Sequence, residues 1–137
     1  MKAPTKDSRL TTGFEPLDAA HEVQLGLLDS LREQLRQKRG AADVRSTVEH
    51  LIGYLQQHFQ AEAHLMRQHA FPDLEPHLQE HDHALHALDR LCERLAHGEA
   101  HVSAEAVEGI ERWLEAHIET RDVPLGRFLC ARSGRRR

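Results

Sequence analysis

Hydrophobic residues recur along this chain at intervals of three and four positions, which is the spacing of one face of an α-helix. Four segments carry this pattern, and each leads into a glycine or a proline. We therefore predict four amphipathic helices joined by connections of a few residues. They cover about 16–40, 43–69, 74–98 and 103–122, with caps expected at Asp43, Asp73 and Ser103 and ends near Gly40, Gly98 and Pro124.

Four such helices predict an all-α fold, an antiparallel up-down-up-down four-helix bundle. Polar residues interrupt the stripes that should face its core. Burying an imidazole or a carboxylate is costly unless it finds a partner. One such histidine is usually a satisfied core residue, whereas six polar residues in facing stripes indicate a shared metal centre. The six are His21, His58, Glu62, His77, His81 and His117.

The composition agrees with a single helical domain. The chain has 137 residues, only 4% of them aromatic, and Leu and Ala are abundant. We expect a short flexible N-terminal arm at 1–14, the bundle at 15–124 and a short basic C-terminal tail at 125–137. Two cysteines, Cys92 and Cys130, are too few for a disulfide framework and are expected to be reduced.

Charge and hydropathy narrow the expected partners and location. The net charge of -4 offers no general attraction for nucleic acid, and we interpret the arginines at 135–137 as a solvated tail. No apolar run approaches the roughly 20 residues of a spanning helix. The first twelve residues lack the apolar stretch of a signal peptide. We therefore expect a cytoplasmic protein without a membrane span.

Histidine is enriched, with 12 in the chain, and its spacing is informative. His58 and Glu62 are four residues apart, as are His77 and His81, so each pair shares a helix face. His117 and Asp122 are five apart, which a regular helix separates by about 140°. The two residues can share a site if the helix loosens or bulges near its end, which Pro124 favours, or if the Asp122 side chain reaches back.

Five imidazoles and two carboxylates are too many donors for one octahedral ion. Two ions can share them if the carboxylates bridge. Mixed nitrogen and oxygen donors suit iron, manganese or cobalt better than zinc at this coordination number.

Two other metal-site patterns fit poorly. Ferritin-like bundles need two Glu-x-x-His motifs, and only Glu80 and His83 have that spacing in the third helix. The zinc motif His-Glu-x-x-His is absent. His83 and His86 point away from the His77 face, so we interpret them as solvated. The same interpretation applies to His50, His64, His69, His97 and His101.

The ordered motifs resemble those of the hemerythrins, particularly the bacterial single-domain forms, over about residues 17–122. Each motif alone is weak, but all four occur in order with every ligand type present. They are Leu17-Asp18-x-x-His21, His58-Phe59-x-x-Glu62-x-x-x-Met66, His77-x-x-x-His81 and Trp113-Leu114-x-x-His117-Ile118-x-x-x-Asp122. The chain departs from the family at Phe14, where a tryptophan is common, and at Ala63, where a second acid is common.

The resemblance implies a non-haem di-iron centre with an oxo or hydroxo bridge. Three histidines, His77, His81 and His117, would hold one iron. His21 and His58 would hold the other, and Glu62 and Asp122 would bridge the two.

The resemblance also implies a function. The iron with two histidines would keep an open position for dioxygen or another small diatomic or anionic ligand, behind an apolar wall of Leu25, Leu55, Phe59 and Leu114. The expected function is reversible dioxygen binding, as a carrier, store or shuttle, and not catalysis. Two alternatives stay open: a sensor or scavenger of oxygen, nitric oxide or redox state that acts through a separate protein partner, and a di-iron enzyme acting on peroxide or nitric oxide.

Overall fold

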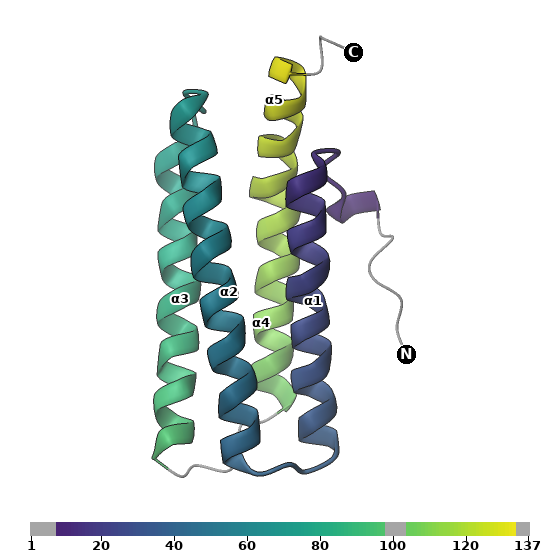
Figure 1. The fold of residues 1–137 in the computed structure, drawn as a ribbon, viewed down its shortest axis with the longest axis vertical. Helices are drawn as coiled ribbons and strands as arrows, with labels where there is room; N and C mark the ends of the chain where they lie inside the picture. Colours follow the sequence, from purple (N-terminus) through teal and green to yellow (C-terminus); the bar gives the residue numbers. More distant parts are fainter. Residues whose placement is uncertain (1–7, 98–103, 134–137) are drawn as a thin grey trace.

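The computed structural model describes residues 8–97 and 104–133. Four helical rods alternate in direction along the chain (Figure 1), which confirms the predicted antiparallel four-helix bundle. The elements are the 3-10 turn η1 (Ser8–Leu10), α1 (Glu15–Arg36), α2 (Ala41–Gln68), α3 (Leu74–Ala96), α4 (Ala104–His117), the π-helical turn η2 (Ile118–Asp122) and α5 (Val123–Ser133).

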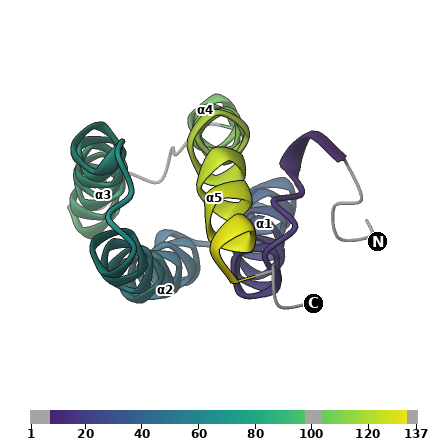
Figure 2. The ribbon, with the colours of Figure 1, turned by 90° about the horizontal axis from the view of Figure 1, so that it is seen from above.

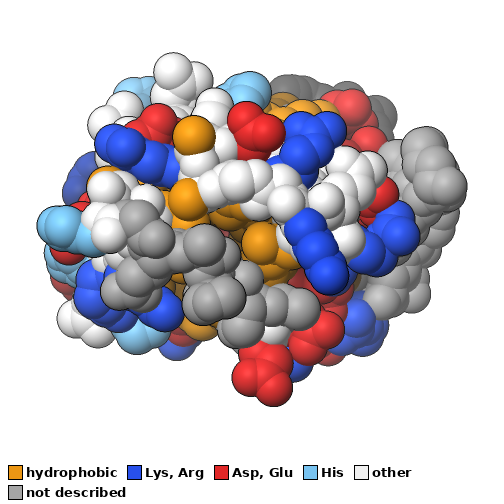
Figure 3. Space-filling view, turned by 90° about the horizontal axis from the view of Figure 1, so that it is seen from below, with side chains coloured by type: hydrophobic (Ala, Val, Ile, Leu, Met, Phe, Trp, Pro, Cys, Tyr) orange, Lys and Arg blue, Asp and Glu red, His pale blue; other side chains and the backbone are white. Residues whose placement is uncertain are grey.

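The helices surround a core that polar side chains divide in two. Seen from above (Figure 2), α2 lies between α1 and α3, and the rod of α4 and α5 lies beside α1. Leu17, Met66 and Leu125 belong to an upper core near the start of α1. Leu28 and Val48 belong to a larger lower core. At the lower end of the bundle (Figure 3), charged side chains lie around hydrophobic ones. No helix in the described part of the chain is long and apolar enough to cross a membrane.

Most predicted helix boundaries lie close to the observed ones. The first helix ends at Arg36 rather than Gly40, because Lys38 adopts a left-handed backbone conformation with φ 58°. The second begins at Ala41, which places Asp43 in its first turn rather than at the cap. Asp73 occupies the predicted N-cap position of α3, but its side chain makes no capping hydrogen bond. Gly98 and Ser103 lie outside the described residues.

The prediction that the last helix ends near Pro124 is wrong. The rod continues as α5, in which Leu125 and Leu129 are buried in the upper core. Pro124 is the second residue of α5, directly after the π turn, so the rod continues through a proline and gives up the hydrogen bond that its missing N–H would have made. The segment expected to be a tail is therefore a helix as far as Ser133.

The segment before α1 packs against the bundle from residue 8 onward. The prediction of a flexible N-terminal arm therefore does not hold for this part of the segment. Leu10 and Thr12 are buried. The Thr12 backbone N–H and hydroxyl both donate to Oδ1 of Asp18, at 2.8 and 2.9 Å. A Cβ added at Gly126 would lie 2.4 Å from the Thr12 Cβ, so only glycine permits this approach between the segment and α5.

Candidate metal centre

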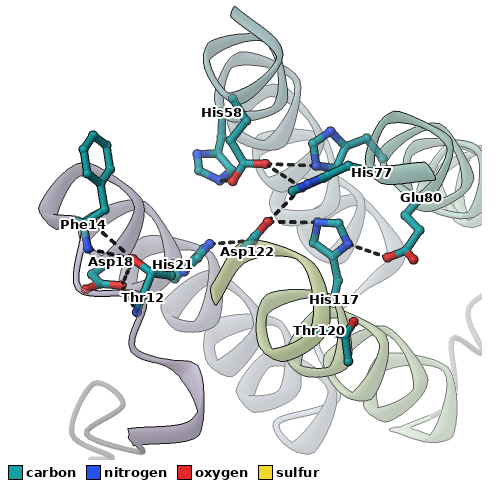
Figure 4. A network of polar contacts seen from close by, with 12 residues as sticks. Thr12, Phe14, Asp18, His21, His58, His77, Glu80, His117, Thr120 and Asp122 are labelled. Atoms are coloured by element: carbon teal, nitrogen blue, oxygen red, sulfur yellow. Dashed lines mark hydrogen bonds and ion pairs between the residues drawn. The ribbon is translucent and has the colours of Figure 1, made fainter. Parts of the chain in front are cut away.

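The structure brings all seven predicted site residues together between the two cores. Each is at most 9% exposed, although all are polar. They come from every rod of the bundle, and Figure 4 shows how five of them point toward one another: His21, His58, His77, His117 and Asp122. His21 lies on α1, His58 and Glu62 on α2, His77 and His81 on α3, His117 at the end of α4 and Asp122 in η2.

Their donor atoms form two groups that share both carboxylates. One group contains three histidines and the other contains two, and within each group all donor atoms lie within 4.8 Å of one another. Donors on opposite sides of one ion are about 4.2 Å apart when each bond is about 2.1 Å long. Small side-chain rotations therefore bring each group onto a single ion. The first group is Glu62, His77, His81, His117 and Asp122, and the second is His21, His58, Glu62 and Asp122.

Short contacts within the centre mostly lack hydrogen-bond geometry. The Nε2 atoms of His58 and His81 lie 2.8 and 3.0 Å from carboxylate oxygens of Glu62. These nitrogens and both Glu62 oxygens nevertheless have no aligned hydrogen bond. Nε2 of His21 is an exception, at 2.9 Å from Oδ2 of Asp122. Nitrogen and oxygen atoms that converge on one place with few hydrogen bonds among themselves are the arrangement that a bound cation would use.

The π turn places Asp122 in this arrangement. The Val123 N–H donates to the carbonyl of Ile118, five residues back, as in a π-helix. The wider turn brings His117 and Asp122 onto the same side, with Nε2 and Oδ1 3.3 Å apart. Of the two possibilities that the spacing left open, the structure therefore shows the bulge, and such π-bulges are frequent at functional sites.

The two carboxylates are held in their charged form. Burial and the nearby Asp122 act to raise the pKa of Glu62, but contacts with three imidazoles hold this pKa far below its usual range. Burial also opposes the charge of Asp122, whose pKa is nevertheless well below its usual value because of His117 and two further histidines. The centre thus keeps two anionic oxygen donors, which a cation needs.

The imidazoles differ in how strongly they hold a proton. Burial acts to lower the pKa of His77, but its contacts with Asp122 and Glu62 raise this pKa to about 9. Burial lowers the pKa of His81 despite its contact with Glu62. A cation must displace the proton of His77 to bind there, so cation affinity falls as the pH falls.

Glu80 supports the centre from outside, and the sequence analysis missed this role. Its Oε1 lies 2.7 Å from Nδ1 of His117, and its Oε2 accepts a 2.7 Å hydrogen bond from Nε of Arg121. The contacts with His117 and Arg121 lower the pKa of Glu80 although burial opposes this. In the sequence, the only signal for this role was the position of Glu80 one residue before His81. The contact itself joins two helices that are far apart in the sequence, so spacing within one helix could not predict it.

Replacing Glu80 by alanine is expected to weaken metal binding without abolishing it. A carboxylate that accepts from the other nitrogen of a ligating histidine fixes the ring, and its loss typically costs 10–100-fold in affinity. Chelator competition at several concentrations measures this change. Glu75→Ala, a charge removal near the start of α3, is the control. Equal affinities for Glu80→Ala and the parent would contradict the supporting role.

Aromatic and aliphatic side chains enclose the centre on its lower side. Phe59 stacks on His81 with ring centroids 3.8 Å apart, and Trp113 stacks on His117 at 4.8 Å. Leu55, Phe59 and Leu114 are buried, as expected for an apolar wall. The fourth expected wall residue, Leu25, is only half-buried, and Gln24 takes the buried position instead.

The remaining histidines lie away from the centre where the structure describes them. His83 and His86 are exposed on α3, as the helix register predicted. His69 is half-buried at the end of α2, and His101 lies outside the described residues. His50, His64 and His97 are exposed.

The buried donors, convergent lone pairs and retained carboxylate charge define a four-helix-bundle protein with a cation-binding centre of histidine, glutamate and aspartate. The family model described as Hemerythrin HHE cation binding domain matches residues 12–124. The chain therefore belongs to the hemerythrin family.

Individual relatives are distant in sequence. The chain is 26% identical over 123 residues to a bacteriohemerythrin of Ralstonia nicotianae, covering 90% of this chain and 86% of that protein. A crystal structure of wild-type hemerythrin matches with a TM-score of 0.84 at 21% identity, covering 92% of this chain and 96% of the other. A hemerythrin with leucine replaced by tyrosine matches with the same TM-score at 22% identity. At such identities the structures establish the fold alone.

Proposed function

We propose that this chain is a non-haem di-iron protein that binds dioxygen reversibly, as an oxygen carrier, store or shuttle. The unequal division of donors carries the proposal. One group has three histidines and two carboxylates, and the other has two histidines and the same carboxylates. With one bridging oxo or hydroxo group, a first ion would have six donors and a second only five, which would leave one position open for a small ligand.

The donor types support iron in both positions. Nitrogen donors mixed with carboxylate oxygens suit iron, and carboxylates shared between the groups suit a pair of bridged ions. Two iron(II) ions would supply the electrons for reversible dioxygen binding. In this proposal His77, His81 and His117 would hold one ion and His21 and His58 the other. Glu62 and Asp122, which belong to both groups, would bridge them.

The protein's own residues position the donors and exclude water. The contact with Glu80 orients the ring of His117. The buried side chains of Leu55, Phe59 and Leu114 keep the lower side of the centre dry, which favours retention of bound dioxygen. Within residues 8–97 and 104–133, Glu62 and Asp122 are the only buried carboxylates. The absence of a further buried acid there supports binding rather than acid-base catalysis.

Iron content and oxygen kinetics test the proposal together. Iron supplied during expression should give about two ions per chain, the number that seven shared donors can hold. Stopped-flow mixing of the reduced protein with oxygen should give a long-lived visible band that fades when oxygen is removed. Rapid decay to the oxidised form would instead support a sensor, scavenger or enzyme. One zinc and no iron after reconstitution would contradict the di-iron assignment.

A further inference from the structure

Gln24 is a buried polar residue that the proposed centre does not use. Its side chain is 0% exposed, and neither its Nε2 nor its Oε1 has a hydrogen-bond partner among the described residues. Within residues 8–97 and 104–133, only one other such atom, Oε1 of the half-buried Gln34, lies outside the seven residues of the centre. Gln24 thus resembles the metal-site residues in having buried polar atoms without hydrogen-bond partners, which is rare among ordinary core residues.

The helix directions place Gln24 beside the two-histidine half of the centre. Gln24 follows His21 by three residues, so both lie on the same face of α1, with Cβ atoms about 5–6 Å apart. Because α1 and α2 are antiparallel (Figure 1), the matching step from His58 leads back to Leu55. The corresponding step from His117 leads to Leu114.

The layer below the two-histidine group is therefore apolar apart from this amide. Leu55 and Leu114 are buried in the lower core, and Gln24 is buried at the same level. An unpaired amide in such surroundings lowers stability, whereas leucine or methionine would fit the layer without that cost. An amide here is useful only to a partner that the protein itself does not supply.

We propose that Gln24 recognises the small ligand of the centre by donating a hydrogen bond from Nε2 to it. This inference rests on the proposed function, because the ligand occupies the open position of the two-histidine ion. A hydrogen bond to a charged acceptor is stronger than one to a neutral acceptor. Gln24 therefore selects ligands whose outer atom carries negative charge, such as small anions or dioxygen that has gained electron density, over neutral ones.

Azide binding to the oxidised, iron-loaded protein tests this role. Gln24→Leu removes the amide and keeps a similar volume, and it should raise the Kd of azide about ten- to hundredfold, the value of one hydrogen bond to a charged group. Gln34→Leu makes the same chemical change ten residues further along α1 and should leave the Kd within about twofold. Visible absorption during azide titration measures both. Equal Kd values for Gln24→Leu and the parent would overturn the proposal.

The metal-free protein provides a second readout. Gln24→Leu should raise the melting temperature of this form, because an unpaired buried amide is removed. A lower melting temperature together with an unchanged azide Kd would show that Gln24 is structural, and would overturn the proposal.

The experiments distinguish a failure of the proposed di-iron function from a failure of the proposed role of Gln24. A parent protein that holds no iron pair contradicts the proposed function, whatever Gln24 does. A parent that holds two irons and binds azide, with the same Kd in Gln24→Leu, contradicts the role of Gln24 alone.

Discussion

Replacing Glu62 by alanine is expected to remove both iron ions, reducing the content from about two per chain to well under one. Glu62 belongs to both donor groups and is completely buried. Its loss takes one oxygen donor from each ion and half of the carboxylate charge of the centre. Iron per chain after desalting measures the effect, and circular dichroism checks that the helices remain.

The ranking of other variants makes this prediction specific. His21→Ala removes a donor from the two-histidine group only, so it should keep part of the three-histidine iron and abolish the oxygen-dependent band. His83→Ala and His86→Ala change exposed residues on α3 and should alter neither iron content nor spectrum. If His83→Ala removes iron as severely as Glu62→Ala does, the assignment of the α3 donors is wrong.

Removing the metal from the parent protein is expected to lower its melting temperature by about 10–15 °C. A ligand present at a thousand times its Kd adds about 4 kcal/mol to the free energy of unfolding. One kcal/mol corresponds to about 3–4 °C for a chain of this size. Without the metal, the converging donors at Glu62, His77 and His81 stay buried without aligned hydrogen bonds, which adds to the loss.

Calorimetry of the iron-loaded and chelator-treated forms measures this difference. Adding iron back should restore the higher melting temperature, while adding magnesium should not, because Mg²⁺ prefers oxygen donors and this centre is rich in imidazole. Identical melting of the two forms would mean that these residues do not bind metal in the folded protein.

The sequence alone determined the features that depend on neighbours along one helix. The four-helix bundle follows from apolar spacing, and the paired positions of His58 with Glu62 and of His77 with His81 follow from the helical repeat. The mismatch in the spacing of His117 and Asp122, one residue too far apart for a regular turn, was visible in the same way, and the structure accommodates it with a π turn. These relations are local, so the geometry of a helix decides them before any helix packs.

The sequence analysis did not predict that the last helix continues as α5. The proline within the chain favoured a helix end, and the burial that opposes this signal depends on residues of other helices. Pro124 and the basic residues after it favour a helix end. The four-residue spacing of Leu125 and Leu129 was the opposing signal, but its value depends on Leu17 and Met66, which lie on other helices. Burial against those residues stabilises α5.

Only the tertiary structure decided which residues meet across helices. The choice of Gln24 rather than Leu25 as the inward residue depends on the rotation of α1 against its neighbours, which a stripe of apolar positions fixes only to within about one residue. The contacts of Glu80 with His117 and Arg121 join α3 to the last rod. The seven donors form one group of five and one group of four, with both carboxylates belonging to each group. This division likewise arises only when the four helices pack together. Such contacts are set by the packing of whole helices, and no spacing within one helix encodes them.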